Sequence, residues 1–134
     1  MPFLMEVIAM TTAVIAAPSV QDHTLRTALL DTARKPVSEA LGKPVLFKVR
    51  ELRATGRWAF LLADMEERGG GPVSYSGTSR AEAAQHGMVS RVYAALLRQD
   101  QDKWVVVDSA IGPTDVAWES WPAKYGAPES LFKL

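Results

Sequence analysis

The chain has 134 residues, with 15 lysines and arginines, 15 aspartates and glutamates, two histidines and no cysteine. This length suits one domain with a hydrophobic core, and the balanced, evenly spread charge offers no basic surface for nucleic acid. Without cysteine, disulfides, thiolate nucleophiles and the common zinc clusters are excluded.

The start of the chain is apolar. Residues 7–17 form an uncharged run that ends in small residues, with Val14 and Ala16 at the spacing of a signal-peptidase site. The run is too short to span a bilayer, which needs about 20 apolar residues. Glu6 and the absence of lysine and arginine before it leave an alternative, in which this segment is a strand or helix of the fold.

We therefore expect residues 1–17 to be a signal peptide that is cleaved near Ala16 or Ala17, and residues 18–134 to be a single domain. The protein would then be periplasmic or secreted, and it would not be an integral membrane protein.

An amphipathic helix is predicted over residues 22–42. Asp22 is a suitable N-cap, and Gly42 followed by Pro44 ends the helix. Pro36 interrupts the pattern, so we expect a kink or two short helices. The apolar stripe comprises Leu25, Leu29, Val37, Ala40 and Leu41.

The hydrophobic period then changes to two, which indicates a β-hairpin. Residues 45–52 and 57–64 are the predicted strands, and residues 54–56 form a tight turn in which Gly56 takes a positive φ. Residues 66–79 are rich in glycine and serine and are expected to form a loop. Its three consecutive glycines lack the lysine and following helix of a phosphate-binding loop.

Two further strands are predicted, over residues 88–98 and 104–111. The last three strands are apolar on both faces, whereas an antiparallel sheet with one wet face alternates more regularly. The predicted helix covers one face only. The other face must be covered by the C-terminal segment, by the long loop or by a second copy of the chain.

The stretch AIGPTDVAWESWPAKYGAPES, residues 110–130, has two interpretations. Thr114 is a possible N-cap, Trp118 and Trp121 lie three residues apart on one face, and Pro122 prevents extension, so a short helix is expected. The two indoles either pack on the sheet as a lid or form the aromatic wall of a pocket. Candidate ligand-binding residues are Trp58, Tyr93, Asp115, Trp118, Trp121 and Tyr125.

The helix at 22–42, the hairpin VLFKVRELRATGRWAFLLAD and the strand pair MVSRVYAALLRQDQDKWVVVDSAIG resemble the cystatin-like superfold, which includes the nuclear transport factor two-like and ketosteroid isomerase-like families. The DKWVVVDSAIGPTDVAW ending also resembles that of small bacterial exported proteins. The resemblance implies an α+β fold, with an N-terminal amphipathic helix packed on a curved four-stranded antiparallel sheet and a short C-terminal helix. In the superfamily the curved sheet makes a cone-shaped pocket or a dimer face.

The leading functional hypothesis is a non-catalytic exported binding or interaction domain. It would use the curved sheet and the C-terminal tryptophans to hold a small apolar molecule or a protein partner, with a homodimer as a further option. The alternative is a small isomerase-like or lyase-like enzyme with Asp64 or Asp108 as base, opposed by a tyrosine.

No cofactor or metal site is expected, because His23 and His86 have no metal-ligand spacing around them. A serine hydrolase is set aside, since no serine lies in a nucleophile-elbow motif. Basic residues are predicted along one outward strip of the sheet, where they either keep the sheet soluble or receive an anionic partner. They are Lys48, Arg50, Arg53, Arg57 and Arg91.

Overall fold

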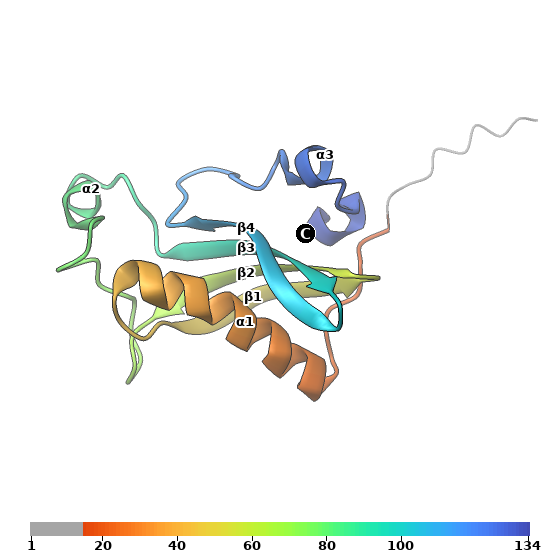
Figure 1. Cartoon of the computed structure of the whole chain (residues 1–134). Helices are drawn as coiled ribbons and strands as arrows, with labels where there is room; N and C mark the ends of the chain where they lie inside the picture. Colours follow the sequence, from red (N-terminus) through yellow and green to blue (C-terminus); the bar gives the residue numbers. More distant parts are fainter. Residues whose placement is uncertain (1–14) are drawn as a thin grey trace, which may run out of the picture.

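The computed structural model describes residues 15–134, so most of the predicted signal peptide lies outside the described residues. The expected α+β arrangement is confirmed: the strands form one antiparallel sheet in the order β1-β2-β3-β4, with helical elements on both faces (Figure 1). In chain order the elements are α1 (His23–Leu41), β1 (Leu46–Thr55), β2 (Trp58–Glu66), α2 (Ala81–Gln85), β3 (Val92–Asp100), β4 (Lys103–Ile111), α3 (Trp121–Tyr125) and the 3₁₀ helix η1 (Glu129–Phe132).

Helix α1 begins and ends where its capping residues predict. The Asp22 carboxylate accepts a hydrogen bond from the Leu25 N–H at 2.9 Å, and Gly42 ends the helix with a left-handed φ of 69°. The helix nevertheless continues through Pro36, so the prediction of two short helices is wrong.

A contact with the sheet lies beside the place where Pro36 interrupts the hydrogen bonds of α1. Proline removes the donor for the Thr32 carbonyl, one residue before Ala33. The Tyr93 hydroxyl, which belongs to β3, donates to the Ala33 carbonyl at 3.1 Å and ties this part of the helix to the sheet.

The layer between α1 and the sheet, called here the helix-side layer, is mostly aliphatic. Four helical residues at intervals of four are buried in it, and Ala40, expected on the stripe, is exposed. A spacing of four therefore describes this helix better than the mixed spacing expected from the sequence. The buried residues of the layer include Leu29, Ala33, Val37, Leu41, Val45, Leu52, Leu61, Met65, Val73, Tyr75, Tyr93 and Leu97.

The first hairpin is confirmed, although its strands are longer than predicted. Thr55 pairs with Trp58 around a two-residue turn, and Gly56 has the expected positive φ of 57°. The pairing register shifts between Val49 and Glu51, so Arg50 is the extra residue of a β-bulge.

A second layer lies on the opposite face of the sheet, beneath residues 113–132, which we call the C-terminal lid (Figure 1). Trp121 is only 4% exposed, and it packs on Phe60 and Phe132. The lid interpretation of the C-terminal segment is thus confirmed for the middle of the sheet. The buried residues of this lid-side layer are Ala17, Phe60, Leu62, Ala94, Leu96, Trp121, Ala127 and Leu131.

The predicted helix of the lid is misplaced. Thr114 and Asp115 lie in exposed bends, and α3 begins at Trp121 instead of ending there. Pro122 is the physical reason: it lies in the first turn of α3, where its fixed φ and missing N–H are well suited to starting a helix.

The segment between β2 and β3 also differs from expectation. The predicted loop is irregular in structure, but Val73 and Tyr75 point into the helix-side layer and are buried. Helix α2 was not predicted. Strand β3 begins at Val92, and Met88, which was expected to start it, lies outside the strand and is 67% exposed.

The two edge strands are protected differently. Residues 17–20 run beside β1, where Ser19 bridges Arg53 and the Val20 N–H donates to the Leu52 carbonyl at 2.9 Å. Within residues 15–134 no comparable backbone pairing covers the outer edge of β4, and none of its residues is fully buried. No helix of the described chain is long and apolar enough to cross a membrane.

Candidate functional site

The predicted site residues do not form one site. Tyr93 and Trp121 are buried on opposite faces of the sheet, Asp115 is exposed, and the remaining three lie around the lid-side layer. Their separation follows from the alternation of side chains along β3 and β2, which the individual residue types do not reveal.

Tyr93 is a core residue of the helix-side layer. Its ring stacks on Phe47 with the centroids 5.3 Å apart, and its hydroxyl bonds to the Ala33 carbonyl. Burial raises the pKa of Tyr93 to about 12, so the phenol is neutral at physiological pH. A hydroxyl held this way is not available to a ligand.

Trp118 and Trp121 share Phe60 as their main aromatic contact. The ring centroids lie 5.9 Å from Phe60 for Trp118 and 6.2 Å for Trp121. Trp121 is buried, whereas Trp118 is half-buried and keeps one side toward solvent. The two indoles therefore act first as packing groups of the lid, and only Trp118 presents surface to a partner.

Trp58 lies at the hairpin end of the same face. The Arg98 guanidinium lies 5.6 Å from the centre of its ring, a cation–π contact between β3 and β2. Asp115 belongs to an exposed bend of the lid, and the structure does not bring it together with Trp58.

Tyr125 is bound to Asp108, one of the two acids considered as a catalytic base. The Tyr125 hydroxyl donates to Asp108 Oδ2 at 2.5 Å, and the Ser109 N–H donates to Asp108 Oδ1 at 2.7 Å. Lys124 Nζ lies 3.9 Å from the same carboxylate. Both carboxylate oxygens accept hydrogen bonds from the chain itself, so this cluster ties the lid to β4 and gives Asp108 a structural role.

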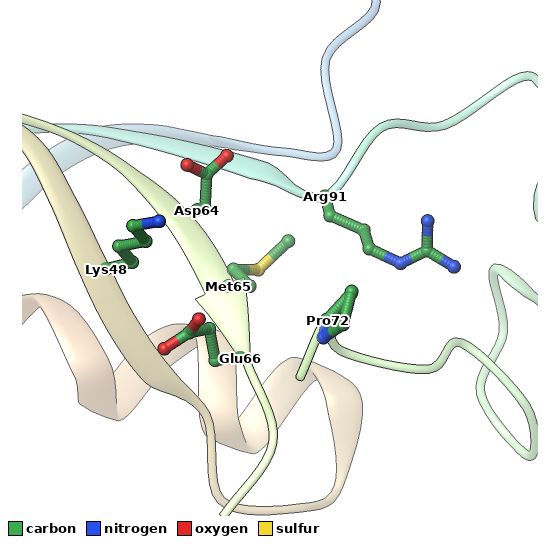
Figure 2. A pocket seen from close by; sticks show the side chains of 6 residues that line it. All are labelled: Lys48, Asp64, Met65, Glu66, Pro72 and Arg91. Carbon is green, nitrogen blue, oxygen red and sulfur yellow. The ribbon is translucent and has the colours of Figure 1, made fainter. Parts of the chain in front are cut away.

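A charged hollow opens on the part of the sheet that the lid leaves uncovered (Figure 2). Its volume is about 260 Å³, and its lining combines both signs of charge. In Figure 2 the Lys48 amine extends toward Asp64, whereas the Arg91 guanidinium points away from both. The lining residues are Lys48, Asp64, Met65, Glu66, Pro72 and Arg91.

Arg50 holds the acid at one side of the charged hollow. Its Nε and Nη2 donate to the two oxygens of Asp64 at 2.9 and 2.6 Å, a bidentate pair. The hydrogen bond to Asp64 raises the pKa of Arg50, which stays charged. Because both Asp64 oxygens accept from Arg50, the second proposed base is also engaged.

The rim of the hollow is held by the loop after β2. Glu67 accepts from the Ser74 N–H at 2.8 Å and from Lys43 Nζ at 3.3 Å. These contacts, with the Ser74 bond first, lower the pKa of the Glu67 carboxyl below its ordinary value. Arg91 Nε donates to the Val73 carbonyl at 2.8 Å, which fixes the other side of the loop.

The structure divides the predicted basic strip. Lys48, Arg50 and Arg91 lie at the charged hollow, but Arg57 lies in the hairpin turn at the other end of β1. Arg53 donates to Glu51 and to the Ala17 carbonyl, so it stabilises the edge of β1.

Three lining residues of the hollow, Met65, Glu66 and Pro72, were not predicted from the sequence. The hairpin register places Glu66 opposite Leu46 and Asp64 opposite Lys48, but this register needs both the two-residue turn and the bulge at Arg50. The predicted turn was longer, so this pairing did not follow from it.

Within residues 15–134 no group of three histidine, aspartate or glutamate side chains is placed to hold a metal ion. Comparison of the chain with family models, with curated proteins and with solved structures gives no match.

Proposed function

We propose that the chain is a non-catalytic exported domain that binds a protein partner at the charged hollow and the adjoining start of β1. The observation that carries this proposal is the open, charged surface where the lid stops short of the end of the sheet. Export is supported by the apolar, small-residue run at 7–17. The element order supports the resemblance to the cystatin-like superfold, which stays a prediction.

Filled layers argue against a small apolar ligand. Tyr93 and Phe60, the largest fully buried side chains of the two layers, are enclosed by other parts of the chain. Ligand pockets are usually apolar and measure about 300–1,000 Å³. The charged hollow is smaller, and four of its six lining residues are charged, so it fits one or two charged side chains of a partner better than an apolar molecule.

The charges of the hollow suit a partner with its own pair of opposite charges. Within the described residues neither Lys48 nor Glu66 takes part in an ion pair. Leu46, opposite Glu66 on the neighbouring strand, is 40% exposed and adds an apolar contact at the edge. A small apolar anchor surrounded by charge is typical of protein interfaces.

The enzyme alternative is not favoured by this geometry. Asp64 is held by Arg50, and Asp108 is held by Tyr125 and the Ser109 N–H. The Tyr125 hydroxyl donates to the acid itself, whereas an isomerase-like site aims its tyrosine at the substrate oxygen.

Site-specific photocrosslinking tests the proposal in cells that export the full chain. A photoreactive residue replaces Leu46, and a matched control replaces Lys35, which is exposed on α1. We expect a discrete protein adduct at Leu46 that weakens with Lys48→Glu and in about 0.5 M salt, with none at Lys35. Equal adducts at both positions, or no adduct at Leu46, would contradict it.

The hypothesis that the domain binds a small apolar molecule is tested separately with the purified protein. A panel of hydrophobic ligands should leave its melting temperature unchanged, because a ligand that binds the folded state raises that temperature. A clear rise with an apolar ligand would favour a small-molecule binder over a protein-binding domain.

A further inference from the structure

Among residues 15–134, packing begins at Ala17. The Ala17 N–H donates to the Ser130 carbonyl of η1 at 2.9 Å, and its own carbonyl accepts from Arg53 Nη1 at 3.2 Å. Its methyl group belongs to the lid-side layer, and the residue is 6% exposed. By contrast Ile15 is 83% exposed and Ala16 is also exposed.

The residues that follow Ala17 stay attached to the sheet. The Pro18 carbonyl accepts from the Ala54 N–H at 3.5 Å, and Val20 bonds to Leu52. These residues cover the outer edge of β1, so removing them would expose it. The domain therefore needs the chain from Ala17 onward, and no contact of Ile15 or Ala16 is required for it.

We infer that the exported chain is processed at the Ala16–Ala17 peptide bond, which leaves Ala17 as the first residue of the mature protein. This inference rests on the proposed export. Water adds across the bond, so Ala16 gains a carboxylate and Ala17 an ammonium, with no oxidation or reduction. The catalyst is a leader peptidase, a class that requires small residues at the first and third positions before the cut, here Ala16 and Val14.

The neighbouring bond fits the fold less well. A cut after Ala17 would remove its bonds to Ser130 and Arg53 and would leave a gap in the lid-side layer. It would also place Ile15, a larger residue, at the third position before the cut. After a cut at Ala16, the new ammonium of Ala17 still donates to the Ser130 carbonyl, and a charged donor strengthens that bond.

Burial of Ala17 also sets the order of events. Because the residue is enclosed by η1 and Arg53 in the folded domain, the bond before it is open to a peptidase only before folding. The cut therefore accompanies export of the unfolded chain.

Two substitutions distinguish the possible cuts, and both lie at exposed positions that leave the fold intact. Ala16→Leu puts a large residue directly before the inferred cut and should block processing. Ile15→Tyr occupies the tolerant middle position and should leave it unchanged, although it would block a cut after Ala17. The intact mass of the full-length gene product, recovered separately from the membrane and the exported fractions, is the measurement.

The expected result is a wild-type chain and an Ile15→Tyr chain that begin at Ala17, with Ala16→Leu retained at its precursor mass. A mature chain that begins at Pro18, or an exported chain that keeps Met1, overturns the inference. An unprocessed chain that stays in the cytoplasm overturns it together with export. The crosslink at Leu46 is scored on its own, so the binding proposal can fail while the processing site holds, or the reverse.

Discussion

The two layers of this protein differ in their side chains and in the elements that cover them. The helix-side layer is covered by α1, a helix of 19 residues that presents aliphatic side chains at regular intervals. The lid-side layer is covered by turns and two short helices whose aromatic rings gather on Phe60. A long regular helix covers its face more completely than an irregular segment, and the charged hollow lies where the irregular cover stops.

Removing the centre of the lid should have the largest effect. Trp121→Ala is expected to lower the free energy of unfolding by about 3–5 kcal/mol, because the indole is buried against Phe60 and Phe132. Urea denaturation followed by circular dichroism gives the value. Trp118→Ala is the matched control, and its half-buried indole should cost less than half as much. Equal losses would mean that the lid has no single anchor.

The helix-side layer should respond to alkaline pH through Tyr93. Burial raises the pKa of Tyr93 to about 12 in the folded protein, above the ordinary value of about 10. The folded state thus holds this proton more tightly, and the stability it contributes is present below pH 10 and lost between about pH 10 and 12. The free energy of unfolding should fall by about 3 kcal/mol over this pH range.

Unfolding curves of wild type and Tyr93→Phe between about pH 8 and 12 test this dependence. The difference between the two proteins isolates Tyr93 from other groups that titrate in the range. If both proteins lose stability in parallel, the phenol is not the cause.

The junction between the layers is sensitive at Gly112, the residue after β4. Its φ is 68°, and an added Cβ would lie 2.9 Å from the Ser90 carbonyl oxygen and 2.9 Å from the Tyr75 hydroxyl. Gly112→Ala should therefore cost about 2 kcal/mol or more. Gly126→Ala is the control, since Gly126 has a φ of 70° with open space around it and should cost only about 1 kcal/mol. The melting temperatures of the two variants compare the backbone strain of a positive φ alone, at Gly126, with the same strain plus a Cβ clash, at Gly112.

The smallest expected effect concerns the bond that joins the lid to β4. Tyr125→Phe removes the donor to Asp108 and should cost about 1 kcal/mol, since the site is partly open to solvent. A double-mutant cycle with Asp108→Ala measures the coupling directly by urea denaturation. A coupling near zero would show that the lid is held by its aromatic contacts alone.

The helix-side layer was largely predictable because local chemistry specifies it. Asp22 and Gly42 mark the ends of α1, and the alternating pattern with Gly56 marks the first hairpin. Each of these residues determines the backbone conformation only within a few positions of itself, so its effect can be predicted from the local sequence. The continuation of α1 through Pro36 was not predicted, and the Tyr93 bond to Ala33 beside it joins residues 60 positions apart, which local patterns do not reveal.

The lid-side layer and the hollow were less predictable because they depend on contacts between distant segments. Pro122 is compatible with either end of a helix, and only its place in α3 shows that it starts one. The hollow depends on the register that sets Lys48 beside Asp64 and on the bulge at Arg50. Neither follows from residue types alone, and the candidate ligand residues were consequently spread over two faces.

The bond between Ala17 and Ser130 has a topological consequence. It brings Ala17, the first packed residue of the described range 15–134, against the last helical turn, so the backbone from Ala17 to Ser130 is almost a closed ring (Figure 1). A circular permutant that joins these two segments with a short linker, and opens the chain in the exposed glycines at 69–71, should keep both layers. In such a protein the order of the segments along the chain would change, but each segment would keep the same neighbours in space.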